Sequence, residues 1–103
     1  MESHSVIDNQ LRFAIANKRL VQVIYHSTPR VAEPHDYGLK QGTAKLLTYQ
    51  IRGTSRTAVH GWKLLDVSKI EGLVVLEQTF RGSRVAAGQR HMEWDELFAR
   101  VRP

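Results

Sequence analysis

The sequence predicts a single α+β domain that is mainly β: one helix, then five antiparallel strands, then a short helix. Three observations support this prediction. Apolar residues recur with a period near 3.6 at both ends of the chain, alternate with a period of two in the middle, and leave gaps too short for the crossovers of parallel strands. The length of 103 residues fits one domain spanning residues 1–103.

The first helix is predicted over residues 5–19. Ser5 and Asp8 have the S-x-x-D spacing in which side-chain oxygens accept hydrogen bonds from the first free amides of a helix. One apolar stripe follows at helical spacing, made of Ile7, Leu11, Ala14 and Ile15. Val6 and Phe13 fall outside that stripe, so we expect this helix to be covered on a second side by another helix or subunit.

Five strands are predicted after this helix. Their ranges are 20–26, 30–33 with a continuation from 37, 45–52, 62–67 and 72–79. Pro34 lacks a backbone donor, so the second strand should lie at an edge or bend there. Because five twisted strands expose two edges unless the sheet curls on itself, we expect a closed SH3-like or Sm-like barrel over residues 20–80.

Two further segments complete the chain. Residues 81–91 are basic and rich in glycine, which predicts a loop. Apolar residues then recur at i, i+3, i+4 and i+7, namely Trp94, Leu97, Phe98 and Val101. This spacing predicts a short helix over residues 92–101 that docks on the barrel.

Basic residues outnumber acidic ones by 15 to 10, and the surplus lies in the middle of the chain. The two ends of the chain each carry equal numbers of basic and acidic side chains. Residues 40–69 carry six basic side chains and a single acidic one, Asp66. A surplus of this kind favours phosphate-bearing partners. The alternative is a basic face that serves to keep the surface hydrated.

Several classes of chemistry are excluded or disfavoured. The chain has no cysteine, which removes disulfides, thiolate metal sites and cysteine nucleophiles. Its five histidines are scattered without metal-ligand spacing, so no metal and no other cofactor is expected. No apolar stretch approaches the roughly 18 residues of a spanning helix, and the first residues do not resemble an export signal. We therefore expect no membrane partner and a cytoplasmic location.

No motif for nucleotide or ester hydrolysis is present, and the protein is predicted not to be an enzyme. One enzymatic alternative is kept: His26 and His60 lie near strand ends and could form an acid/base pair for phosphodiester cleavage at the barrel mouth. His35 beside Asp36 resembles half of a general-base arrangement. Adjacent residues on an extended chain point to opposite sides, however, so this pair is not expected to meet.

The candidate binding residues come from the basic middle segment, where cations and aromatic rings are interleaved. Phosphates are neutralised by Lys and Arg, and unpaired bases stack on aromatic rings at about 1–3 kcal/mol each. The predicted phosphate contacts are Lys45, Arg52, Arg56, Lys63 and Lys69; the predicted stacking rings are Tyr49 and Trp62; and His60 is a polar contact. The alternative for both rings is core packing with the polar tip at the rim.

A longer pattern extends from Leu11 to Phe80. Its motifs are a strand ending at Tyr25, the stretch Arg30-Val-Ala-Glu-Pro34, a strand ending Leu47-Thr-Tyr49, and Lys69-Ile70 before an apolar strand. This order resembles the WYL domain of bacteria, although Lys45-Leu46-Leu47 stands where the family has Trp-Tyr-Leu. The resemblance implies an Sm-like barrel that acts as a sensor or regulator of nucleic-acid or nucleotide ligands, and it adds Arg30 to the candidate contacts.

The leading prediction is a non-enzymatic regulatory or sensor module that binds single-stranded DNA, RNA or a nucleotide. An alternative from another class is a protein-interaction module, in which Val6 and Phe13, or the C-terminal helix, pack against a second copy of the chain or a partner protein. The ribonuclease that uses His26 and His60 is the third possibility.

Overall fold

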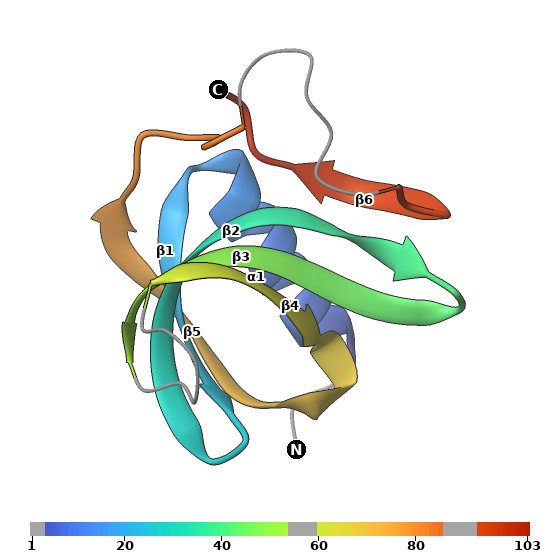
Figure 1. Cartoon of the computed structure of the whole chain (residues 1–103), viewed down its shortest axis with the longest axis horizontal. Coiled ribbons are helices and arrows are strands. Elements are labelled where there is room, and N and C mark those ends of the chain that lie inside the picture. Colours follow the sequence, from blue (N-terminus) through green and yellow to red (C-terminus); the bar gives the residue numbers. More distant parts are fainter. Residues whose placement is uncertain (1–3, 54–59, 86–92) are drawn as a thin grey trace.

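The computed structural model describes residues 4–53, 60–85 and 93–103, which form one helix and one six-stranded antiparallel sheet (Figure 1). The elements run in the order α1 (His4–Ala16), β1 (Arg19–Tyr25), β2 (Thr28–Lys40), β3 (Thr43–Gly53), β4 (Gly61–Asp66), the 3-10 helix η1 (Val67–Lys69), β5 (Ile70–Thr79) and β6 (Glu96–Arg100). The prediction of an N-terminal helix followed by antiparallel strands is confirmed. No helix in the described ranges is long and apolar enough to cross a membrane.

The helix α1 ends three residues earlier than its predicted end at residue 19. Lys18 has a φ of 53°, a left-handed conformation that turns the chain into β1. Leu11, Ala14 and Ile15 are buried, as the apolar stripe predicts. The Asp8 carboxylate accepts hydrogen bonds from the Tyr37 hydroxyl and from Arg12.

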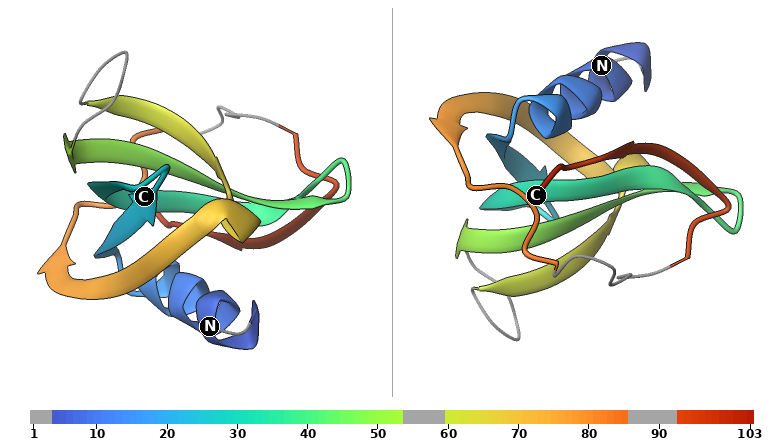
Figure 2. Two further views of the ribbon diagram at one scale, coloured as in Figure 1. Left: turned by 90° about the horizontal axis from the view of Figure 1, so that it is seen from below. Right: turned by 90° about the horizontal axis from the view of Figure 1, so that it is seen from above.

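The sheet has the strand order β4-β3-β2-β1-β5, and it is open. The expectation of a closed barrel over residues 20–80 is wrong, because β4 and β5 do not pair in the described chain. β4 pairs with β3 as far as Asp66, η1 then forms a corner, and β5 pairs with β1 from Ile70 onward. The helix α1 covers one side of the twisted sheet, so the core is closed by a helix where a barrel would use another strand pair (Figure 2).

The predicted C-terminal helix is also wrong: residues Glu96–Arg100 form the strand β6, which pairs with β2. The cause lies in β2, whose early residues pair with β1 as far as Ala32. The stretch of β2 from Asp36 to Leu39 would be left without a partner on that edge, and β6 supplies one. Pro34, which cannot donate to a ladder, lies where β2 changes from one partner to the other.

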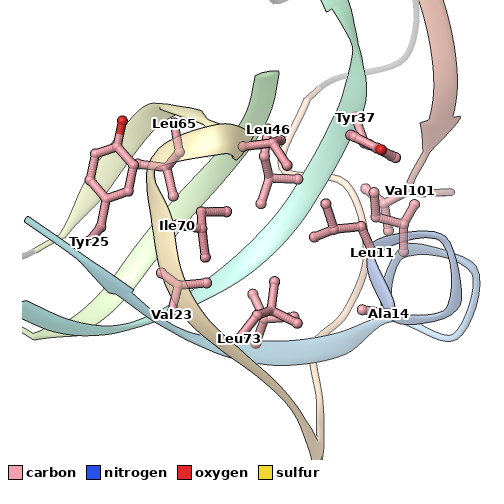
Figure 3. Packing of buried hydrophobic residues seen from close by; sticks show 13 residues of the cluster. Leu11, Ala14, Val23, Tyr25, Tyr37, Leu46, Leu65, Ile70, Leu73 and Val101 are labelled. Atoms are coloured by element: carbon pink, nitrogen blue, oxygen red, sulfur yellow. The ribbon is translucent and has the colours of Figure 1, made fainter. Parts of the chain in front are cut away.

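The core lies between α1 and the inner face of the sheet, the face that carries Val21, Val23, Leu46, Leu65 and Leu73 (Figure 3). Leu11 and Ala14 approach it from the helix, and Val101 from the end of β6. Side chains alternate along each strand, so the neighbours of these residues point to the opposite side, the outer face. The outer face of β2, β3 and β4 carries the candidate site.

Candidate nucleic-acid interface

The structure brings the two predicted stacking rings together on the outer face. Tyr49 of β3 and Trp62 of β4 are cross-strand partners. Their ring centroids lie 5.3 Å apart at 86°, an edge-to-face arrangement. Trp62 remains 39% exposed, whereas Tyr49 is half-buried. The indole is therefore the ring of this pair that offers a surface to a ligand.

Arg84 lies over the Tyr49 ring, with its guanidinium carbon 3.8 Å from the ring centroid. Glu33, the cross-strand neighbour of Tyr49 on β2, holds it there by accepting two hydrogen bonds, at 2.6 and 3.0 Å. These bonds raise the pKa of Arg84, and burial opposes the rise. A base cannot stack on the Tyr49 face that Arg84 covers. Sequence reasoning missed the role of Arg84, although the Arg-Gly-Ser-Arg run at 81–84 marks the segment as basic.

His35 is buried beneath this surface and supports it. The backbone N–H of Arg84 donates to His35 Nε2 at 3.1 Å, so Nε2 must accept and the ring proton lies on Nδ1, which faces the Glu33 carbonyl oxygen at 2.9 Å. The imidazole contacts the Trp62 ring edge-to-face at 4.7 Å. It thereby ties the segment around Arg84 to the aromatic pair. Asp36 bonds elsewhere, to Arg100 and Trp94, so no His35–Asp36 pair forms.

Two of the predicted phosphate contacts, Lys45 and Lys69, both form ion pairs with Asp66. Lys45 lies opposite Asp66 across β3 and β4 and bonds to Oδ1, and Lys69 reaches Oδ2 at 3.3 Å. Hydrogen bonds from Lys45 and then Lys69 lower the pKa of Asp66. A phosphate that bound these lysines would have to compete with this carboxylate.

The remaining cations lie on both faces of the sheet. Arg52 is exposed and pairs in register with Val31, and it forms no ion pair within the described ranges. Lys63 shares the inner face with its cross-strand partner Thr48, and Arg30 lies on the inner face of β2 opposite Val23. The described members of the predicted set of phosphate contacts therefore do not share one surface. Arg56 lies outside the described residues.

His60 and His26 lie in different connections between strands: His26 lies between β1 and β2, and His60 lies just before β4. His60 is exposed at the bend before β4. His26 has a φ of 52° in the turn between β1 and β2, and its ring packs against Tyr25 at 4.5 Å. In the part of the chain that the structure describes, no hydrogen bond or ring contact joins the two imidazoles, and no group of three His, Asp or Glu side chains is placed to hold a metal ion.

Comparison with known proteins gives no relative for this chain: no protein family, curated protein or solved structure matches it.

Proposed function

We propose that this chain is a non-enzymatic module that binds single-stranded nucleic acid, or a nucleotide ligand, through the outer face of β3 and β4. The observation that carries the proposal is the exposed indole of Trp62, held edge-to-face against Tyr49 by strand pairing. Bases stack on such rings whatever their sequence, because every base has a π-face. A rigid ring loses little entropy when a base binds to it.

Phosphate contacts come from arginines around this ring. Arg81, Arg84 and Glu33 line a groove beside Tyr49, together with Ile51 and Phe80. The Arg84 side chain is 44% exposed, so its bond to Glu33 leaves donors available on the outer side. Arg52, on β3, adds an exposed cation. Together these three arginines can follow a sugar–phosphate backbone that passes the ring.

The resemblance to WYL domains fits a regulatory role for such a surface. In this proposal, ligand binding at Trp62 is the input of a sensor, and the rest of the chain carries the response to a partner. The His26/His60 ribonuclease lacks support from any contact between the two imidazoles.

The test is the affinity of Trp62→Ala for fluorescein-labelled 15-mers of dT and U, followed by fluorescence anisotropy at low salt. Loss of one stacked base should weaken binding by roughly 1–3 kcal/mol, which is about 5-fold to 150-fold. Trp62→Phe should retain part of the affinity because it keeps a ring. Circular dichroism checks that both variants are folded.

The matched control is Phe13→Ser. Phe13 is 49% exposed on α1, where it lines an apolar groove with Leu73, Val74 and Val75, away from the Trp62 surface. This groove supports the second candidate function, a protein-interaction module. Under our proposal Phe13→Ser leaves oligonucleotide affinity unchanged. If no oligonucleotide binds the wild-type chain, and sedimentation shows an oligomer that Phe13→Ser disperses, the second function replaces the first.

A further inference from the structure

Gln50 is buried without a hydrogen-bond partner. Its side chain on the inner face of β3 is 1% exposed, and neither Oε1 nor Nε2 finds a partner within the described ranges. Buried amides in proteins are nearly always bonded, because a buried polar atom that loses water and gains nothing is costly. Nothing in the sequence marks this residue as unusual. Its amide has two donors and an acceptor to offer to a ligand.

Arg30, close to Gln50, also has a buried polar atom without a hydrogen-bond partner. Gln50 pairs in register with Ala32, and Arg30 lies two residues earlier on β2, on the same face. The Nε of Arg30 is buried without a partner, and no carboxylate of the described chain forms an ion pair with the guanidinium. The guanidinium of Arg30 lies over the Tyr25 ring, with its carbon 5.4 Å from the ring centroid. A partly buried cation without a counter-charge favours an anion.

Small residues flank Gln50 across the sheet at this end of the inner face. Ala32 and Gly61 are the cross-strand neighbours of Gln50, and both are small. A β-carbon placed on Gly61 would meet no atom within 4 Å. Lys63, opposite Thr48 on the same face, adds a second positive charge. The sheet is open, so this end is not closed by pairing between β4 and β5 in the described chain.

We propose that Gln50 and Arg30 form a mononucleotide site on the inner face, separate from the Trp62 surface. The Gln50 amide pairs with adjacent donor and acceptor atoms on the edge of a nucleobase, as amide side chains do with bases. The phosphate lies on Arg30, with Lys63 nearby. Entry requires Arg30 to leave the Tyr25 ring, which gives up one cation–π contact and gains a charge-assisted hydrogen bond. This site does not depend on base stacking at Trp62.

The test is calorimetric titration of the whole chain with the 5′-monophosphates of adenosine, guanosine, cytidine and uridine. At least one should bind, and the corresponding nucleoside and ribose 5-phosphate should each bind at least tenfold more weakly, because each lacks one of the two recognised groups. Absence of binding by all four nucleotides overturns the proposal. Equal binding of ribose 5-phosphate overturns the role of Gln50.

Variants separate this site from structural roles and from the outer surface. Gln50→Leu should abolish nucleotide binding while raising the urea midpoint of the free protein, since it removes an unpaired buried amide. If Gln50→Leu instead has a lower urea midpoint and still binds nucleotides, the Gln50 amide stabilises the fold through a bound water molecule. That result would overturn the proposal. Gln50→Met and Arg30→Met provide second variants should Gln50→Leu not fold, and Arg102→Met, at an exposed arginine outside both surfaces, is the matched cationic control. Gln50→Leu should leave the affinity for the dT 15-mer unchanged, so failure of the outer surface and failure of this site are distinguishable.

Discussion

Each buried carboxylate of the described chain is held by a partner from a distant segment. Asp36, 2% exposed, accepts two bonds from Arg100 at 2.9 and 3.0 Å and one from Trp94 Nε1 at 3.2 Å. Glu33 is held by Arg84 in the same way. Removing the arginine of such a pair costs about 3–5 kcal/mol, because the carboxylate then stays buried without a counter-charge. These pairs attach the C-terminal third of the chain to β2.

Tyr37 is a single residue whose titration reports on the contact between α1 and the sheet. Burial, and then the hydrogen bond that its hydroxyl donates to Asp8 at 2.8 Å, raise its pKa to about 12. Because the folded pKa exceeds the ordinary value of 10.0, Tyr37 stabilises the fold below pH 10 and this contribution is lost as the pH rises toward 12. Tyrosinate absorbance should therefore show a late-titrating component that belongs to Tyr37.

The assignment is checked with two variants. Tyr37→Phe should remove the late component, and Asp8→Asn should move it to lower pH by removing the anion that opposes ionisation. Tyr49→Phe is the control and should leave it in place. A late component that survives Tyr37→Phe would contradict the assignment.

At the scale of elements, β6 shows why periodicity alone failed near the C-terminus. The spacing of Trp94, Leu97, Phe98 and Val101 fits a helix. A helix here would leave the backbone groups of β2 from Asp36 to Leu39 unpaired on one edge, whereas the strand β6 pairs with them. Trp94 then lies against Gly38, and Val101 enters the core. Tertiary pairing overrides local preference wherever an open edge is available.

The docking of β6 depends on the absence of a side chain at position 38. A β-carbon on Gly38 would overlap the carbonyl oxygen of Glu96 and lie 3.0 Å from the Trp94 ring. Gly38→Ala should therefore lower the free energy of unfolding by about 1–3 kcal/mol, the usual cost of overpacking. In a Trp62→Phe background, the fluorescence of Trp94 should move toward that of an exposed indole.

Gly72→Ala is the matched control for this substitution. Gly72 also lies in a strand, and a β-carbon there would meet the Ile24 side chain at an ordinary 3.8 Å. Its stability to urea should be unchanged or slightly raised, since alanine restricts the unfolded chain. If both variants lose the same free energy of unfolding, the cost comes from replacing a glycine in a strand. The close approach of β6 to Gly38 would then not be its cause.

At the scale of the whole molecule, the basic surplus is divided between the two faces of one sheet. Arg30 and Lys63 lie on the inner face, Lys45 and Lys69 are paired with Asp66, and the exposed Arg52 is on the outer side. An oligonucleotide on the outer face therefore meets three arginines and not the whole set of cations.

This division predicts a shallow salt dependence. For single-stranded nucleic acid, each phosphate contact contributes about −0.7 to the slope of log affinity against log salt concentration. Three contacts therefore give a slope of about −2. Convergence of six cations would give about −4. The measurement is the dT 15-mer affinity over a series of salt concentrations, with Arg52→Met reducing the slope by about one contact. A slope near −4 would contradict the arrangement described here.

The sequence alone determined the local features of this protein. Helical spacing from Ile7 to Ile15 set the buried side of α1, and alternation set the positions of the strands, because both depend on residues close together in the chain. It also brought Tyr49 and Trp62 into one candidate site. Tertiary structure decided the rest: the open sheet, β6 in place of a helix, the Glu33–Arg84 cover over Tyr49, and the unpartnered amide of Gln50. Each of these depends on which strand edges and buried polar groups find partners, and partners distant in sequence meet through the fold of the whole chain.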